Sequence, residues 1–155
     1  MKSERIFSMI PTPRVLALDL GKKRIGLAVS DELGVTAQGL PTLERRNKRA
    51  DLAAILALAR ERNVTEILMG NPLHMSGKAG RQAEWVQEFA EALARYTGLT
   101  VRLWDERLTT VEASRVLRAS GIGIEKRAAA VDRLSAVILL QSYLDSREYR
   151  REDHQ

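Results

Sequence analysis

The chain has 155 residues, of which 45% are hydrophobic, and this length and composition predict one globular domain with a full core. It contains no cysteine, which excludes disulfide frameworks, thiolate nucleophiles and cysteine-bound zinc, and favours the cytoplasm. The net charge of +5 favours a polyanionic partner such as nucleic acid, although a solvated surface alone would also account for it. No apolar stretch approaches the roughly 20 residues of a membrane span, so we expect no membrane partner.

The first elements along the chain predict a hairpin-led sheet. Residues 1–13 contain two prolines and no periodicity, and we expect them to form a flexible leader. Apolar runs on either side of a Gly-Lys-Lys turn predict a strand at 14–20 and a second strand at 24–30 that pairs back on it. A weaker strand at 35–43, interrupted by Gly39 and Pro41, is typical of a sheet edge.

Helices and buried strands then alternate to the end of the domain. We expect strands at 66–70 and 101–104, helices at about 47–62, 81–96, 109–120 and 128–146, and a charged tail at 147–155. The domain is therefore predicted at 14–146. Its order predicts an α/β fold with a five-stranded mixed sheet and helices on both faces.

Three carboxylates lie where burial is most expected. Asp19 is inside the apolar run 14–20, Glu106 closes the run 101–106, and Asp132 lies on the apolar side of the last helix, with Ser135 and Ala136 among its helical neighbours. Buried carboxylates need pairing, protonation or a cation, and several of them brought together repel one another. The usual remedy is a divalent metal, so this pattern makes a metal-dependent phosphoryl-transfer site the first hypothesis.

Each carboxylate also has a purely structural interpretation. Asp19 could cap the turn that follows it, and Asp132 could be an N-terminal helix residue favoured by the helix dipole. Asp105 competes with Glu106, because successive strand residues point to opposite faces and parity alone does not choose between them. Glu106 could also be a solvated strand end that pairs with a neighbouring arginine.

Basic and polar residues near these carboxylates are candidates for phosphate contact. The loop at 70–78 precedes a helix, and helix N-termini bind phosphate, but the loop lacks the spacing of a Walker A motif. The basic clusters at loops favour nucleic acid over scattered surface charge. The candidate nucleic-acid-binding residues are Lys22, Lys23, Arg24, Asn71, His74, Lys78, Arg107, Lys126, Arg127 and Arg133.

Four stretches in this order resemble one known family. They are ALDLGKKRIGLAVSD at 17–31, GNPLHMSG at 70–77, WDERLTTVEA at 104–113 and VDRLSAVILLQSYLD at 131–145. Each motif alone is weak, but together they resemble the YqgF/RuvX family of Holliday-junction-resolvase-like, pre-16S rRNA processing nucleases, over residues 14 to 146. The chain departs from the usual family pattern at Lys22, Asn71, His74 and Ser76, and the segment 125–130 is less basic than usual. These departures concern substrate binding and leave the three carboxylates unchanged.

The resemblance implies a ribonuclease H-like fold, which agrees with the predicted element order. It also implies that Asp19, Glu106 and Asp132 form a catalytic, metal-binding triad, and so selects Glu106 over Asp105. The implied cofactors are Mg²⁺ or Mn²⁺, two ions per site, since both prefer oxygen ligands.

We therefore expect a divalent-metal-dependent nuclease that hydrolyses phosphodiester bonds in structured nucleic acid. Its expected reaction is 5′-end processing of precursor 16S rRNA by a cytoplasmic monomer or weak homodimer, with ribosomal particles as further partners. One alternative is a Holliday junction resolvase, which cuts a four-way DNA junction and needs two active sites, hence a dimer. Another is a non-catalytic nucleic-acid-binding module. A nucleotide-binding domain of the actin-like type is disfavoured, because it needs two such domains and the chain has room for one.

Overall fold

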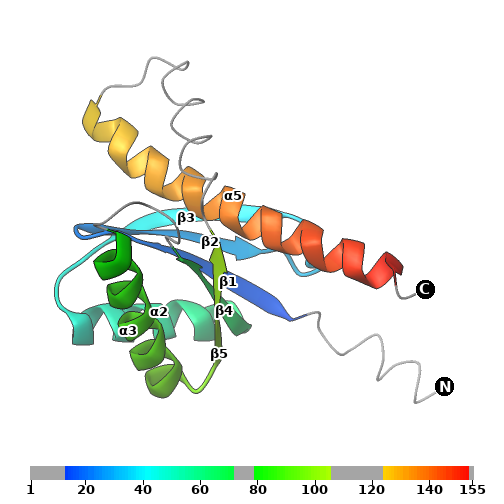
Figure 1. Cartoon of the computed structure of the whole chain (residues 1–155), viewed down its shortest axis with the longest axis horizontal. Helices are drawn as coiled ribbons and strands as arrows, with labels where there is room; N and C mark the ends of the chain where they lie inside the picture. The colour runs from blue at the N-terminus through cyan, green and yellow to red at the C-terminus, as the bar shows by residue number, and fades with distance from the viewer. Residues whose placement is uncertain (1–12, 72–78, 106–123, 154–155) are drawn as a thin grey trace.

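Figure 1 shows the computed structural model of the chain, which describes residues 13–71, 79–105 and 124–153. The five strands form a single mixed sheet in the order β3-β2-β1-β4-β5. Their bounds are β1 Arg14–Leu20, β2 Arg24–Ser30, β3 Ala37–Glu44, β4 Val64–Asn71 and β5 Thr100–Asp105. The predicted five-stranded mixed sheet is therefore confirmed, and β3 lies at an edge, as its glycine and proline indicated.

Strand directions follow from how the strands are connected. The tight turn after β1 makes β2 antiparallel to it, with Asp19 opposite Gly26, and β3 is antiparallel to β2. The crossovers through helices make β4 parallel to β1, and β5 parallel to β4. The carboxyl ends of β1, β4 and β5 consequently meet at one edge of the sheet, where open α/β sheets commonly place their ligands.

Within the described residues, three helices cover the two faces of the sheet. Helices α2 (Lys48–Glu61) and α3 (Ala79–Thr97) lie on one face, and α5 (Ile124–Asp153) crosses the other (Figure 1). Each face has its own hydrophobic cluster. The first contains Leu16, Leu18, Ile55, Phe89 and Leu93. The second contains Val15, Ala17, Leu68, Ala136 and Leu140. Successive side chains of β1 point to opposite faces, so the strand contributes to both clusters. Its odd-numbered residues face α5, and its even-numbered residues face α2 and α3.

The helix ends agree with the sequence signals. The side chain of Asn47 caps α2 by accepting a hydrogen bond from the amide of Ala50 at 2.9 Å. Gly98, with a φ of 72°, follows the end of α3 in the left-handed conformation that favours glycine. The helix expected at 109–120 lies outside the described residues. Among the helices that are described, none is long and apolar enough to cross a membrane.

The last helix differs from its predicted bounds at both ends. It begins at Ile124 rather than Ala128 and continues to Asp153, so residues 147–153 of the expected tail are helical. Charged side chains such as Arg147 are good helix formers, and composition alone did not separate a charged helix from a charged tail. Asp132 therefore lies two turns inside α5. A favourable helix dipole falls off within the first turn, so it does not explain this position.

Candidate active site

Asp19 lies near the carboxyl end of the central strand β1. It shares the parity of Val15 and Ala17, which belong to the hydrophobic cluster under α5, and it is half-buried. The tight turn from Gly21 to Arg24 follows, closed by a hydrogen bond from the amide of Gly21 to the carbonyl of Arg24 at 2.9 Å. Asp19 thus lies at the edge where β1, β4 and β5 end, on the side of the sheet that α5 covers.

Gly26 brings α5 against this part of the sheet. It is the cross-strand partner of Asp19, and a Cβ atom built on it would overlap the main-chain carbonyl of Asp132. Glycine is therefore required for helix and strand backbones to approach so closely. The main chain of Asp132 thus lies against the residue that is paired with Asp19.

The Asp132 side chain is held by an arginine of the sheet. The Nε atom of Arg24 donates to Oδ2 of Asp132 at 3.0 Å, and the two side chains are 32% and 24% exposed. One turn further along α5, Ser135 is buried, and its hydroxyl has no hydrogen-bond partner within the described structure. The inward face predicted for Asp132 from its helical neighbours agrees with this placement.

Strand parity separates Asp105 from Asp19. Trp104 packs in the cluster beneath α5, whereas Val101 packs against the cluster on the opposite face. Asp105 has the parity of Val101, so it points away from the side on which Asp19 lies. Glu106 lies outside the described residues. Within the described part of the chain, no group of three His, Cys, Asp or Glu side chains is placed to hold a metal ion.

The predicted nucleic-acid-binding residues other than Arg24 fall into four groups. Lys22 and Lys23 are exposed in the turn beside Asp19, and Arg133 is exposed on α5 with its stem over Gly39. Asn71 ends β4 and is 7% exposed, so its position offers little surface for a phosphate. Lys126 and Arg127 lie in α5, while His74, Lys78 and Arg107 lie outside the described residues.

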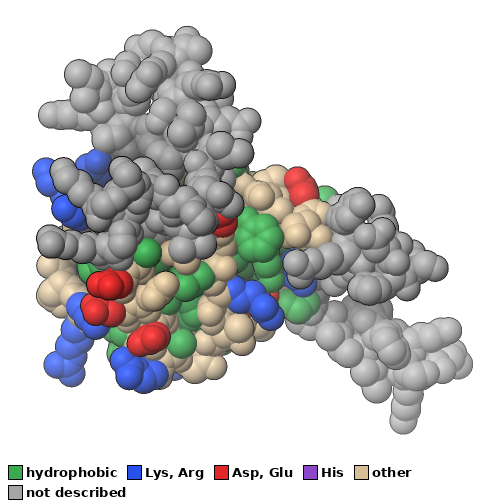
Figure 2. All heavy atoms as spheres, in the orientation of Figure 1, with side chains coloured by type: hydrophobic (Ala, Val, Ile, Leu, Met, Phe, Trp, Pro, Cys, Tyr) green, Lys and Arg blue, Asp and Glu red, His purple; other side chains and the backbone are tan. Residues whose placement is uncertain are grey.

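The basic side chains do not gather into one patch on the face that Figure 2 shows. Within the described residues of that face, Lys and Arg side chains alternate with Asp and Glu side chains and with hydrophobic ones. The positive charge of the described residues on that face is therefore distributed rather than concentrated. On that face, local basic groups and not a broad basic surface are the candidates for phosphate contact.

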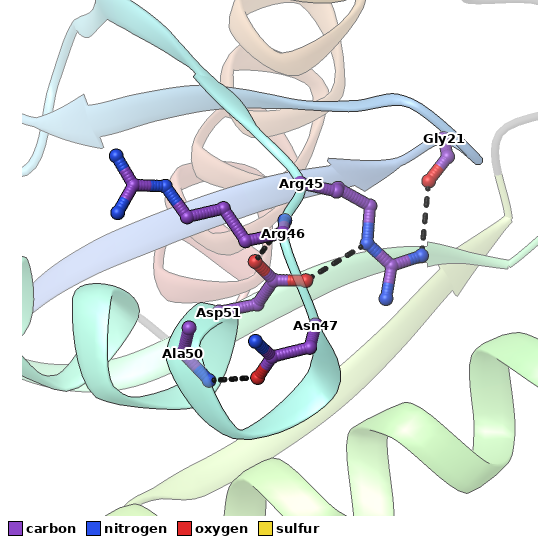
Figure 3. Close-up of polar contacts among 6 residues, drawn as sticks. All are labelled: Gly21, Arg45, Arg46, Asn47, Ala50 and Asp51. Carbon is purple, nitrogen blue, oxygen red and sulfur yellow. Dashed lines mark hydrogen bonds and ion pairs between the residues drawn. The ribbon is translucent and has the colours of Figure 1, made fainter.

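Sequence analysis missed a buried ion pair that supports this turn. Arg45 donates through Nε to Asp51 at 3.1 Å and through Nη1 to the carbonyl of Gly21 at 3.2 Å (Figure 3). Its guanidinium also lies over the rings of Trp85 and Phe89, 5.2 and 5.4 Å from their centroids. Arg45 thus ties the turn after Asp19 to α2 and α3.

A signal for this pair was present in the sequence. Asp51 precedes Ile55 and Ala59 at intervals of four residues, so it lies on the buried stripe of α2. A carboxylate on such a stripe calls for a partner, and Arg45 is close in the sequence. The run of basic residues at 45–49 is instead one of the basic loop clusters from which the sequence predicts nucleic-acid binding.

The topology and the position of the two carboxylates define a ribonuclease H-like fold with its candidate site at the ends of the central strands. Solved structures agree with this class: RuvC of Thermus thermophilus in complex with a Holliday junction substrate aligns over 88% of this chain and 96% of its own, with a TM-score of 0.54 and 15% sequence identity. A second structure of Thermus thermophilus RuvC gives a TM-score of 0.53 at 12% identity.

The chain belongs to the RuvX family, whose model, described as Holliday junction resolvase, matches residues 13–146. A protein of Koribacter versatilis named "Putative pre-16S rRNA nuclease" is 54% identical over 140 residues, which are 90% of this chain and 92% of the relative. A relative of the same name from Myxococcus xanthus is 47% identical over 133 residues, 86% of this chain and 88% of that protein.

Proposed function

We propose that this chain is a divalent-metal-dependent nuclease that hydrolyses phosphodiester bonds in structured nucleic acid and processes the 5′ end of precursor 16S rRNA. One observation carries the proposal. Gly26 lets α5 contact the sheet so closely that Asp132 lies against the strand residue paired with Asp19. Two half-buried acidic residues from distant parts of the chain are thereby brought to neighbouring positions on one side of the sheet, near the carboxyl end of β1.

The donor set fits a hard divalent cation. Both carboxylates supply oxygen ligands, and Asp132 already has a positive partner in Arg24, as expected for a charge that is costly to leave alone. We propose that Asp19, Glu106 and Asp132 together hold Mg²⁺ or Mn²⁺, two ions per site. When bound, such ions activate a water and stabilise the oxygen that leaves a phosphodiester.

The residues of the chain would orient the substrate. Lys22 and Lys23, exposed in the turn beside Asp19, supply positive charge for the phosphates on either side of the cleaved bond. Arg45 holds the carbonyl of Gly21 and so fixes this turn relative to Asp19. The relatives from Koribacter versatilis and Myxococcus xanthus, whose names refer to pre-16S rRNA, support RNA as the substrate, with ribosomal particles as partners.

The test compares the wild-type protein with Asp19→Asn. Purified proteins are incubated with Mg²⁺ or Mn²⁺ and with end-labelled precursor 16S leader RNA. We expect wild-type protein to cut the RNA and Asp19→Asn to lose at least about a hundredfold in rate, because the variant removes a charge from the metal site while it keeps the size of the side chain. The matched control is Glu61→Gln, which removes an exposed carboxylate at the end of α2 and is expected to cut like wild type. Equal cleavage by Asp19→Asn would refute the proposal.

A junction resolvase is the second candidate, favoured by the family description and by the fold shared with RuvC. Symmetric cleavage of a four-way junction needs two active sites and therefore a dimer. A labelled four-way DNA junction is offered in parallel with the RNA, and sedimentation is measured with and without the junction. Paired symmetric nicks by a dimer would support this candidate, and a monomer on junction DNA would count against it. Binding of either nucleic acid without cleavage would indicate a non-catalytic module.

A further inference from the structure

The ion pair between Arg24 and Asp132 joins the sheet to the candidate metal site. Arg24 is the first residue of β2, and Asp132 lies in α5, yet Nε of the arginine is 3.0 Å from Oδ2 of the aspartate. Neither side chain is more than a third exposed, at 32% and 24%. The pair is thus partly withdrawn from water. Two charges interact more strongly in such a place than on an open surface.

The backbone that carries Arg24 is fixed from several directions. Its carbonyl accepts the amide of Gly21 at 2.9 Å, which closes the turn. Arg45 then clamps the turn twice, since its amide donates to the carbonyl of Lys23 at 2.9 Å and its guanidinium to the carbonyl of Gly21 at 3.2 Å (Figure 3 shows the second contact). The backbone at Arg24 is therefore held by hydrogen bonds, and its side chain, unlike those of Lys22 and Lys23, is only partly exposed.

A guanidinium and a divalent cation compete for one carboxylate. The hydrogen bond from Arg24 occupies a lone pair of Asp132 Oδ2, which a metal ion would also need. The positive charge of Arg24 also repels any cation that approaches this carboxylate. Removal of the charge relieves both effects. The loss of an ordered partner for Asp132 acts in the opposite direction, but glutamine at position 24 keeps a hydrogen-bond donor, so the charge effect dominates.

We propose that Arg24 is a positioning residue that acts as the counterion of Asp132 before metal binds and yields this carboxylate to the incoming divalent cation. The inference rests on the proposed function and adds to it a residue of the chain that sets metal affinity. Arg24 thus keeps Asp132 paired and oriented in the metal-free protein. Its positive charge weakens the binding of the metal ion. Its expected role as a direct nucleic-acid contact is then secondary to this one.

The test measures Mn²⁺ affinity of the full-length protein by calorimetry, with free Mn²⁺ followed in parallel by electron paramagnetic resonance. We expect Arg24→Gln to bind Mn²⁺ roughly three- to tenfold more tightly than wild type, which corresponds to the loss of one partly exposed ionic contact. Arg24→Lys, which keeps the charge, should stay within about twofold of wild type. The matched control is Arg60→Gln, which removes an exposed charge at the end of α2 next to the start of β4, and it should also bind like wild type.

Unchanged or weaker Mn²⁺ binding by Arg24→Gln would overturn the inference while leaving the proposed function intact. If neither wild type nor Asp132→Asn bound Mn²⁺, the result would refute the metal site itself and the inference with it. Circular dichroism establishes that each variant is folded.

A second measurement needs no variant. Nuclear magnetic resonance follows the arginine Nε–H signals of wild-type protein as Mg²⁺ is added. The Arg24 signal should shift as its bond to Asp132 is lost, while those of Arg14 and Arg45, which donate to Ser30 and Asp51, stay in place. A constant Arg24 signal during a titration that moves the amide of Asp19 would overturn the inference.

Discussion

At the scale of single residues, Gly26 has the largest influence on the candidate site. It contributes no side chain, and its value lies in the space that it leaves for the main chain of Asp132. Glycine inside a strand is normally unfavourable, because it costs backbone entropy and packs no side chain. Its presence opposite Asp19 is explained by the approach of α5.

Gly26→Ala should therefore affect stability and activity together. The new Cβ overlaps main-chain atoms of Asp132, which cannot rotate away, so α5 must shift as a body. We expect the free energy of unfolding to fall by about 1–3 kcal/mol, the usual cost of overpacking. We also expect nuclease activity to fall at least about tenfold, because a displacement of Asp132 misplaces a proposed metal ligand. Urea denaturation and the cleavage assay measure the two effects.

Gly39→Ala is the matched control for this prediction. Gly39 lies on the neighbouring strand β3 under the same helix, but the atoms that its Cβ would meet belong to the side chains of Arg133 and Val137. A flexible arginine stem can move, so the loss of stability should stay below about 1 kcal/mol. If Gly26→Ala were as stable and active as Gly39→Ala, the close approach of α5 would not position Asp132.

At the scale of elements, two of the polar contacts that fasten α5 to the sheet lie well apart along the helix. Near its beginning, Asp132 binds Arg24, and further along, the hydroxyl of Tyr143 donates to Oε1 of Glu66 in β4 at 2.7 Å. Glu66 also pairs with Arg102 of β5, and the ring of Trp104 meets that of Tyr143 edge to face with centroids 5.2 Å apart. The second place thus connects α5 to both β4 and β5.

Tyr143→Phe should loosen this second fastening without changing the packing of the ring. At neutral pH we expect the free energy of unfolding to fall by about 1–2 kcal/mol, because a buried hydrogen bond to a carboxylate is lost. Burial, and then the hydrogen bond and charge of Glu66, raise the pKa of Tyr143 above its ordinary value. The neutral phenol is therefore favoured in the folded protein.

The pH dependence follows from the direction of that shift. Since the folded pKa is raised, the stabilisation is complete below the unfolded pKa of about 10 and is lost as the pH rises through the folded pKa. The stability difference between wild type and Tyr143→Phe should therefore shrink above about pH 10. Chemical denaturation from pH 7 to 11 tests this, with the exposed Tyr96→Phe as control. A difference that stays constant with pH would contradict the assignment.

At the scale of the whole molecule, the core and the candidate site are separate. The two hydrophobic clusters lie on opposite faces of the sheet, and neither includes Asp19 or Asp132. The ion pair of Arg45 with Asp51 is on the side of α2 and α3, away from α5. We therefore expect the chain to fold without the proposed metal, in contrast to small domains that a structural zinc holds together.

Metal removal should consequently abolish cleavage but preserve the fold. With excess EDTA we expect no nuclease activity and an unchanged far-ultraviolet circular dichroism spectrum. If the metal was present at a concentration near its Kd before EDTA was added, the free energy of unfolding should fall by less than about 1 kcal/mol. Excess Mg²⁺ should restore activity in full. A cooperative loss of helical signal in EDTA would show instead that the metal is structural.

Local signals in the sequence were enough to predict the order and kind of the described elements. The apolar run of β1, the alternating run of β2, the Asn47 cap and the Gly98 stop are local signals, and the structure confirmed them. The family, and with it the ribonuclease H-like fold and the nuclease class, followed from four motifs in a fixed order, and the comparisons confirmed this prediction. The triad, with Glu106 outside the described residues, stays a prediction.

Only the tertiary structure decided which residues meet. No periodicity reports that a helix backbone will lie on Gly26, because that contact depends on how α5 crosses a sheet whose strands come from other parts of the chain. For the same reason, Arg24 and Arg45 looked alike as members of basic clusters, yet one holds Asp132 and the other holds Asp51. Local sequence fixes backbone conformation over a few residues, whereas the partner of a charge is chosen by packing between elements distant in the chain.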